Sequence, residues 1–173
     1  MKKIAFILAS VLVAACSSTH KADTSQTGQT SPQNAGAAAN PATASVSPED
    51  AAMSKLAAEI QALQKKSAYF DFDKSVVKPE FQDDIREQAS FLKNHKNVVV
   101  TLEGNCDERG SVAYNRVLGE GRAMAVKNSL ELLGVPAAQI RTVSFGKDKP
   151  RLQCHEEKCW KEDRRVDFIH KLG

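Results

Sequence analysis

One stretch of the sequence combines an acid and an arginine that could together bind a zwitterion. Asp107 lies in the glycine-bounded run 104–110, and Arg122 follows it in a segment with helical periodicity. A carboxylate accepts hydrogen bonds from an ammonium group, and a planar guanidinium binds a carboxylate through two parallel hydrogen bonds. Asn115, Leu118 and Arg122 are spaced by three and four residues, so a helix places them on one face, leaning back toward Asp107. The pattern predicts a pocket with a negative and a positive wall.

A structural role for the same two residues is the alternative. Asp107 and Arg122 could bridge each other and brace the loop against the helix. Gly119 and Gly121 favour a binding role, because each glycine costs about 1 kcal/mol in a helix interior and indicates close approach by another group. Peptidoglycan carries an ammonium and a carboxylate on one carbon, at the free amino-acid end of meso-diaminopimelate. Spacing alone leaves both interpretations open.

The histidines give little support to an enzyme. His20 lies in a polar segment, His95 at a helix end, His155 between two cysteines and His170 on the last strand. Hydrolysis needs a nucleophile with a positioned base, or a metal with an open ligand position. We therefore expect a binding protein with no catalytic residues and no cofactor.

The cysteines predict a disulfide rather than a metal site. Cys154 and Cys159 are close enough in sequence to close a small ring, and an exported chain meets an oxidising compartment. Zinc could use Cys154, His155 and Cys159, but no second Cys/His pair stands at ligand spacing. Cys106 is then expected to be a semi-buried thiol beside the 104–110 loop.

The N-terminus has the order of a secretory signal. Basic Lys2 and Lys3 precede the apolar run 4–13, and Ala14 and Ala15 lead into Cys16. The apolar run is much shorter than the roughly 20 residues that a spanning helix needs. The cysteine at this point resembles the lipobox of bacterial lipoproteins, which implies cleavage after residue 15 and a lipid on Cys16. The alternative is an ordinary secreted protein that loses Cys16 with its signal.

Charge and composition define the next segment and exclude one class of partner. The chain carries 24 Lys and Arg against 21 Asp and Glu, so loss of Lys2 and Lys3 would leave a net charge of +1. Such a balance gives no basic field for nucleic acid. Residues 16–47 are rich in Ser, Thr, Gln, Ala and Pro, and we expect a lipidated Cys16 followed by a disordered tether.

A helix should follow the tether, over 48–66. Ser47 suits the N-cap and Pro48 the first turn. Apolar residues spaced by three and four predict a packed face comprising Met53, Leu56, Ile60 and Leu63.

The remaining chain, 67–173, predicts a single α+β domain. We expect strands at 67–73, 98–102, 142–145 and 164–170, with helices at 79–95 and 111–133. The run 98–102 is apolar on both faces and predicts an inner strand. Alternating strands and helices indicate a small mixed sheet with helices packed on one face.

Five ordered motifs in this region resemble the OmpA-like C-terminal domain family, and within it the peptidoglycan-associated lipoproteins. They lie at 69–74, 104–110, 114–123, 143–150 and 164–166, and the resemblance extends from 67 to 171. It implies a βαβαββ domain that binds the diaminopimelate of the peptidoglycan stem. Resemblance to Gram-negative lipoproteins also implies an outer-membrane protein facing the periplasm, because the second mature position holds Ser17 and not the Asp that signals retention in the inner membrane.

The resemblance assigns a role to each candidate site residue. Asp107 and Arg122 become the pair that grips diaminopimelate, and Arg165 supports the site. The expected lining and strand-end contacts are Phe72, Asp73, Arg109, Asn115 and Leu118. TolB and other Tol proteins are the implied partners, docking on 76–84 and the exposed side of the 113–133 helix.

This chain departs from the family pattern at four places, one of which is Cys106, at a position that is usually small or polar. Gly121 stands where a second arginine usually precedes Arg122, and Asp163 replaces a common Asn. The Cys154–Cys159 loop is more similar to OmpA than to the lipoproteins.

Overall fold

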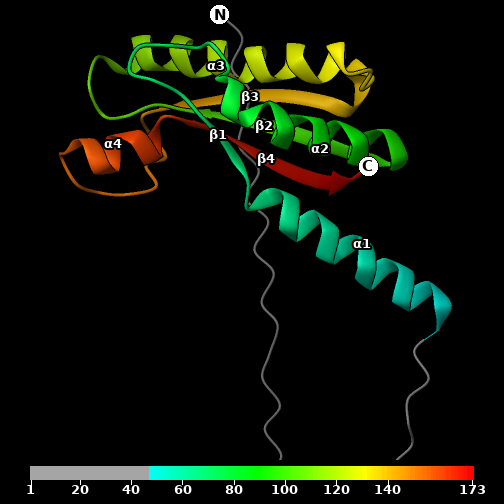
Figure 1. Cartoon of the computed structure of the whole chain (residues 1–173). Helices are drawn as coiled ribbons and strands as arrows, with labels where there is room; N and C mark the ends of the chain where they lie inside the picture. Colours follow the sequence, from blue (N-terminus) through cyan, green and yellow to red (C-terminus); the bar gives the residue numbers. More distant parts are fainter. Residues whose placement is uncertain (1–46) are drawn as a thin grey trace, which may run out of the picture. The chain divides into compact units, whose positions relative to one another are not determined.

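The computed structural model describes residues 47–173, which contain four strands and four α-helices (Figure 1). The predicted signal, Cys16 and most of the predicted tether lie outside these residues. The elements are α1 Pro48–Gln64, β1 Ser67–Tyr69, η1 Pro79–Phe81, α2 Gln82–Asn94, β2 Val98–Asn105, α3 Val112–Leu132, η2 Ala137–Gln139, β3 Ile140–Gly146, α4 Glu157–Asp163 and β4 Arg165–Leu172.

The strands form one mixed sheet in the order β1-β4-β2-β3. β2 runs parallel to β3 and antiparallel to β4, with Val100 opposite His170 and Leu102 opposite Phe168. β1 adds antiparallel to the other edge of β4. The predicted α+β class and mixed sheet are confirmed, with α2 and α3 lying over one side of the sheet (Figure 1).

The core lies between that face of the sheet and the two helices. Val98, Val100 and Leu102 are fully buried, whereas Val99 and Thr101 between them are only half-buried. β2 is an inner strand as predicted, and only one of its two apolar faces is covered by helices. Because α2 and α3 cover one face alone, burial follows the period of two of a half-covered strand.

Helix α1 joins the core only through its C-terminal half. Ser47 caps it by accepting the N–H of Asp50. Leu63 is buried and its carbonyl accepts a hydrogen bond from Gln88 of α2. Met53, predicted to pack, is instead 56% exposed, because the N-terminal half of α1 extends away from the sheet (Figure 1).

The first strand is shorter than its aromatic alternation predicts. Only Ser67–Tyr69 pairs with β4, and the N–H of Phe70 makes the last bond, to the carbonyl of Arg164. The chain then turns, and Asp73 takes a left-handed φ of 58°. Phe72 and Asp73 therefore stand on a loop beyond the strand.

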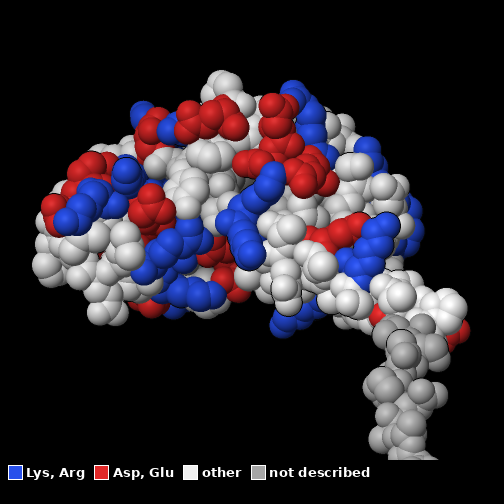
Figure 2. Space-filling model, turned by 60° about the horizontal axis from the view of Figure 1, so that its bottom comes forward, with Lys and Arg blue, Asp and Glu red and all other residues white. Residues whose placement is uncertain are grey.

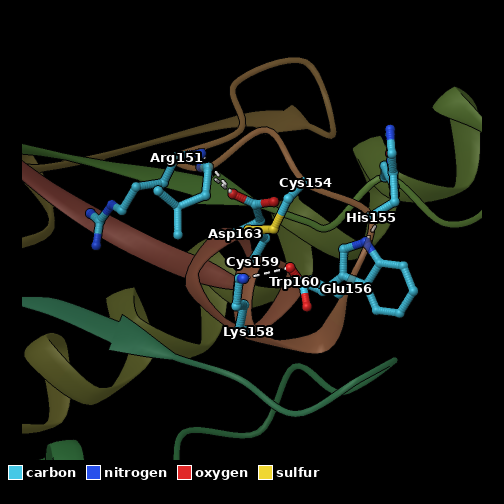
Figure 3. The surroundings of a disulfide bond; sticks show 10 residues. Arg151, Cys154, His155, Glu156, Lys158, Cys159, Trp160 and Asp163 are labelled. Carbon is cyan, nitrogen blue, oxygen red and sulfur yellow. Dashed lines mark hydrogen bonds and ion pairs between the residues drawn. A yellow bond between two sulfur atoms is a disulfide. The ribbon is translucent and has the colours of Figure 1, made fainter.

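Between β3 and β4 the sequence predicted only a loop, but the structure contains α4. This helix is seven residues long and has no side-chain N-cap hydrogen bond, so it carries none of the usual start signals. Its last residue, Asp163, is buried and accepts the backbone N–H groups of Arg151 and Leu152. A disulfide joins Cys159 of α4 to Cys154 of the preceding loop, with the Cα atoms 5.7 Å apart (Figure 3).

Helix α3 crosses β2 at two facing glycines. A Cβ on Gly104 would lie 1.9 Å from the carbonyl oxygen of Gly119, so α3 could not approach β2 as closely if residue 104 had a side chain. The group that approaches Gly119 closely is thus Gly104 of β2 and not a ligand. Gly121 is different, because a Cβ there would meet Ser75 at an ordinary 3.5 Å.

Within 47–173, no helix is both long and apolar enough to cross a membrane.

Candidate functional site

A cavity of about 200 Å³ opens where β2 ends and α3 begins. Three segments form it: the turn after β1, the loop after β2 and the first three turns of α3. It is lined by Phe72, Asp73, Cys106, Asp107, Arg109, Gly110, Tyr114, Asn115, Leu118 and Arg122. The structure therefore brings seven of the eight predicted site residues together.

Local hydrogen bonds fix the loop between β2 and α3. Gly110 takes a φ of 93°, which suits glycine, and the hydroxyl of Ser111 caps α3 by accepting the N–H of Tyr114. Asn115 donates to the carbonyl of Arg109, and Lys147 donates to the carbonyls on either side of Arg109. The backbone carbonyl groups of residues 108–110 are therefore already hydrogen-bonded within the protein.

Asp107 is buried and surrounded by cations. Its Oδ1 accepts the backbone N–H and Nε of Arg109, and its Oδ2 lies 2.6 Å from Arg109 Nη2 and 3.3 Å from Arg164 Nη1. Burial by itself raises the pKa of Asp107, but the hydrogen bonds from Arg109 and Arg164 together hold that pKa below its usual value. The carboxylate is therefore ionised at neutral pH.

Arg122 is completely buried and holds backbone rather than a carboxylate. Its Nε donates to the carbonyl of Lys74, Nη1 to that of Asn105 and Nη2 to that of Asp71. Burial lowers the pKa of the guanidinium, which stays charged as arginine does in proteins. Three of its five N–H groups are thus in use, so at most two remain for a ligand.

Asp107 and Arg122 do not pair with each other; each has its own protein partners. The brace proposed as their alternative role is consequently not the arrangement seen. Arg122 does brace the turn after β1 against the end of β2, but through carbonyl groups.

The turn after β1 supplies one wall of the pocket. The Phe72 ring is 55% exposed and its centroid lies 4.0 Å from the Arg109 guanidinium carbon. Asp73 accepts the hydroxyl of Tyr114 and forms no ion pair within residues 47–173. Asp73 is therefore the acid of the pocket that makes no direct ion pair within the described residues.

Arg165 is the predicted site residue that stands apart. Its Nε donates to both oxygens of Asp167, and it does not line the pocket. Its neighbour Arg164 reaches Asp107 instead and also donates to the carbonyl of Phe70. Arg164 lies just before β4 and contacts the pocket residue Asp107, whereas Arg165, the first residue of the strand, bonds Asp167.

Trp160 on α4 is a further residue at the site that the sequence did not suggest. Its ring centroid lies 4.1 Å from the Arg109 guanidinium carbon, and its Nε1 donates to Glu108. The hydrophobic spacing of the chain contains no signal for this contact, because α4 itself was not expected.

Cys106 lines the pocket as a buried thiol, more deeply than expected. Its Sγ lies 3.4 Å from the carbonyl oxygen of Asn115. Burial raises the pKa of this thiol to about 11, so it is protonated and unreactive at neutral pH.

No metal site is found within residues 47–173, and the face in Figure 2 is not dominated by charges of one sign. Residues 47–173 contain no group of three or more His, Cys, Asp and Glu side chains placed to hold a metal ion. Basic and acidic groups are interspersed over the face shown in Figure 2. This mixture agrees with the near-neutral charge of the sequence.

The sequence pattern of the OmpA family matches residues 69–162. The chain belongs to the OmpA family. The matched range contains every pocket residue, from Phe72 to Arg122, together with Trp160.

Curated relatives are more than a third identical to the chain over the residues that align. Peptidoglycan-associated lipoprotein from Pseudomonas aeruginosa is 45% identical over 100 residues, covering 58% of this chain and 59% of that protein. The protein of that name from Agrobacterium fabrum is 39% identical over 98 residues, covering 57% and 55%. The chain thus spans little more than half the length of these relatives.

Solved structures show the same fold. The crystal structure of the peptidoglycan-associated lipoprotein from Burkholderia pseudomallei is 42% identical, with a TM-score of 0.61, over 61% of this chain and 90% of that one. The C-terminal domain of Helicobacter pylori MotB has a TM-score of 0.58 at 18% identity, a likeness that shows a shared fold and nothing more.

Proposed function

We propose that this chain binds peptidoglycan non-covalently, through the diaminopimelate of the peptide stem. The observation that carries the proposal is one small cavity lined by two acids and two arginines. Relatives that share the matched region carry the name peptidoglycan-associated lipoprotein, which supports the same ligand.

The charges of the pocket suit the zwitterionic end of diaminopimelate. Asp107 already accepts hydrogen bonds from two arginines, so its negative charge is already balanced before the ligand ammonium binds. Asp73, which forms no ion pair within residues 47–173, completes the negative charge that this ammonium needs. The ligand carboxylate then meets the remaining N–H groups of Arg122 and Arg109.

Asn115 and Leu118 shape the pocket around these charges. Asn115 is buried and holds the loop carbonyl of Arg109, while Leu118 contributes an apolar wall for the methylene chain of diaminopimelate. This division of labour, with few polar groups fixing the ends and an apolar wall between them, is usual for small-ligand sites.

The proposal extends to the cell envelope. Cys16 would carry the lipid in the outer membrane, and the segment up to residue 47 would allow the domain to reach the wall in the periplasm. Weak binding at each site is sufficient there, because confinement near a polymer raises the effective concentration. The chain would thereby tether outer membrane to cell wall within a Tol-Pal-type system that maintains envelope integrity and acts in cell division.

Sedimentation with purified sacculi tests the binding. Wild-type protein should sediment with sacculi, and free meso-diaminopimelate should release it. Asp107→Asn should reduce the bound fraction at least tenfold. Asp148→Asn is the matched control, since Asp148 is an exposed carboxylate paired with Arg116 outside the pocket. Equal sedimentation of wild type and Asp107→Asn would contradict the proposal, and release of muropeptides would contradict the absence of enzymatic activity.

A second candidate function is protein docking, with TolB and other Tol proteins as partners. Val76, in the segment after β1, is 71% exposed. Val117 on α3 is 74% exposed, and Met124 on α3 is also exposed. Ser75 lies against Gly121 of α3, which places the segment after β1 beside these α3 side chains. An apolar surface shared by 76–84 and α3 would suit a protein partner.

Charge substitutions on that surface separate the two functions. Val76→Lys and Val117→Lys should weaken capture of purified TolB while leaving sedimentation with sacculi intact. Loss of both activities, or of neither, would contradict a separate docking surface.

A further inference from the structure

The disulfide loop and α4 reach the pocket through a stack of three side chains. The guanidinium of Arg109 lies 4.0 Å from the Phe72 centroid and 4.1 Å from the Trp160 centroid. Both rings therefore lie within cation–π distance of the same guanidinium. The guanidinium also donates to both oxygens of Asp107. Arg109 is thus held by two aromatic rings and one carboxylate.

The position of Trp160 depends on the disulfide. Cys159 is buried and precedes Trp160 on a helix of only seven residues. A helix so short is not stable on its own, and its position must come from tertiary contacts. The bond to Cys154 supplies one of these contacts, and Asp163 supplies another by accepting N–H groups from the same loop (Figure 3).

A second set of contacts connects the same elements to the pocket loop. Glu108 accepts hydrogen bonds from Trp160 Nε1 at 2.9 Å, and its carboxylate lies 2.7 Å from His155 Nδ1. His155 and Trp160 belong to the loop and the helix that the disulfide joins (Figure 3). Both residues next to Asp107 on the loop side, Glu108 and Arg109, are therefore held from α4 and its loop.

We propose that Trp160, held in place by the Cys154–Cys159 disulfide, is a positioning residue that presets Arg109 for ligand binding. The inference rests on the proposed function, because Arg109 lines the proposed diaminopimelate pocket. An arginine already fixed in its binding geometry loses less side-chain freedom when the ligand carboxylate arrives. Removing the Trp160 ring takes away one of the two aromatic contacts and lets the guanidinium sample other rotamers.

Affinity for a soluble stem peptide carrying meso-diaminopimelate tests the proposal, in the fragment 47–173, which contains the hydrophobic core between the sheet and its helices. Trp160→Ala should weaken binding about fivefold, as expected for the loss of one cation–π contact. Trp160→Phe keeps the ring but loses the bond to Glu108, and should restore affinity to within about twofold of wild type. Lys158→Ala is the control on the same helix, since Lys158 is exposed and paired with Glu156.

The disulfide is tested by combining substitutions. Cys154→Ser with Cys159→Ser should weaken binding about as much as Trp160→Ala, again roughly fivefold. Adding Trp160→Ala to that double variant should cause little further loss, because both changes act on the same contact. Full additivity of the two effects would overturn the role of the disulfide, and unchanged or tighter binding by Trp160→Ala would overturn the role of Trp160.

A readout without ligand keeps this inference separate from the proposed function. In free wild-type protein the NMR signal of the Arg109 Nε–H should be displaced by the ring currents of both aromatic groups. Trp160→Ala should move the signal toward its random-coil position, and Trp160→Phe should largely preserve it. An Arg109 signal that Trp160→Ala leaves unchanged would overturn the inference even if the protein binds peptidoglycan. Failure of wild type to bind the stem peptide, with the signal behaving as expected, would overturn the proposed function alone.

Discussion

Two buried polar side chains brace opposite ends of β2, and only one of them is charged. Arg122 donates to three backbone carbonyls near Asn105, at the carboxyl end of the strand. Gln139 also donates to three carbonyls, those of Leu92, His95 and Val98, at the amino end. We call these regions the Arg122 end and the Gln139 end.

The comparison separates what the fold needs from what the pocket needs. A neutral amide suffices to satisfy backbone carbonyls at the Gln139 end, at lower desolvation cost than a buried cation. A buried arginine doing the same work at the Arg122 end therefore indicates that its charge has another use. We propose that this use is the binding of a ligand carboxylate in the neighbouring cavity.

The largest change in the free energy of unfolding is expected from substitutions of Arg122, including Arg122→Gln, which gives the Arg122 end the side chain found at the Gln139 end. Arg122→Gln can still donate to some of the carbonyls, whereas Arg122→Ala leaves all three without a donor and should lower the free energy of unfolding by about 3–5 kcal/mol. Urea denaturation should show Arg122→Gln recovering part of this loss. Binding of the stem peptide should be lost in both variants. Retained affinity in Arg122→Gln would show that the charge is not needed.

The Gln139 end should respond to acid through His170, which pairs with Val100 in the sheet. Its ring is buried without a hydrogen-bond partner on either nitrogen within residues 47–173, and burial lowers its pKa to about 4. The histidine of the unfolded chain takes up a proton near the ordinary pKa of about 6.5. Between about pH 4 and pH 6.5 the unfolded chain therefore binds more protons than the native state. Stability is therefore complete above pH 6.5 and should fall by about 3 kcal/mol as pH drops to 4.

The variant His170→Phe isolates this effect. Urea denaturation at several pH values should show that the variant lacks the decline between pH 6.5 and 4. Asp107, whose pKa is lowered, contributes stability that is lost only at still lower pH. Parallel pH profiles of wild type and variant would contradict the assignment to His170.

A smaller effect is expected from Gln139→Ala. The three carbonyls that it satisfies would lose their donor, and the free energy of unfolding should fall by about 1–3 kcal/mol. Affinity for the stem peptide, measured at a temperature where the variant is folded, should be unchanged. Weaker binding would mean that the two ends are coupled and that the comparison does not separate fold from function.

The smallest stability change should come from the disulfide, which lies outside both ends. It closes a ring with a sequence separation of only 5 residues, so its loss should cost about 2 kcal/mol or less. Thermal melting of wild type with and without a dithiol reductant measures this, and Cys154→Ser with Cys159→Ser should match the reduced wild type. A much larger loss would show that the sheet itself depends on α4.

Local patterns predicted the elements with strong periodicity and missed those held by distant contacts. The apolar stripes of α2 and α3 and the β-branched run of β2 identify those elements well. Helix α4 could not be anticipated, because a disulfide and the buried Asp163 hold a segment without capping signals. β1 was predicted too long because alternation does not reveal where its partner strand ends.

The same distinction holds in the pocket. Asn115, Leu118 and Arg122 line it together, as their spacing on one helix predicted. Arg164 reaches Asp107 across 57 residues of sequence, and nothing in the Arg-Arg motif shows which arginine faces the loop. The resemblance assigned a supporting role to Arg165, and the structure adds Arg164, just before β4, as a residue that contacts Asp107.

The central claim is that the pocket recognises a carboxylate and an ammonium on one carbon. Two stem peptides identical except at one residue test it by titration calorimetry with the wild-type fragment 47–173. One carries meso-diaminopimelate, and the other carries lysine, which keeps the ammonium but lacks the second carboxylate. Our account predicts that the diaminopimelate peptide binds at least about tenfold more tightly, the equivalent of about 1.4 kcal/mol. Equal affinity for the two peptides would contradict it.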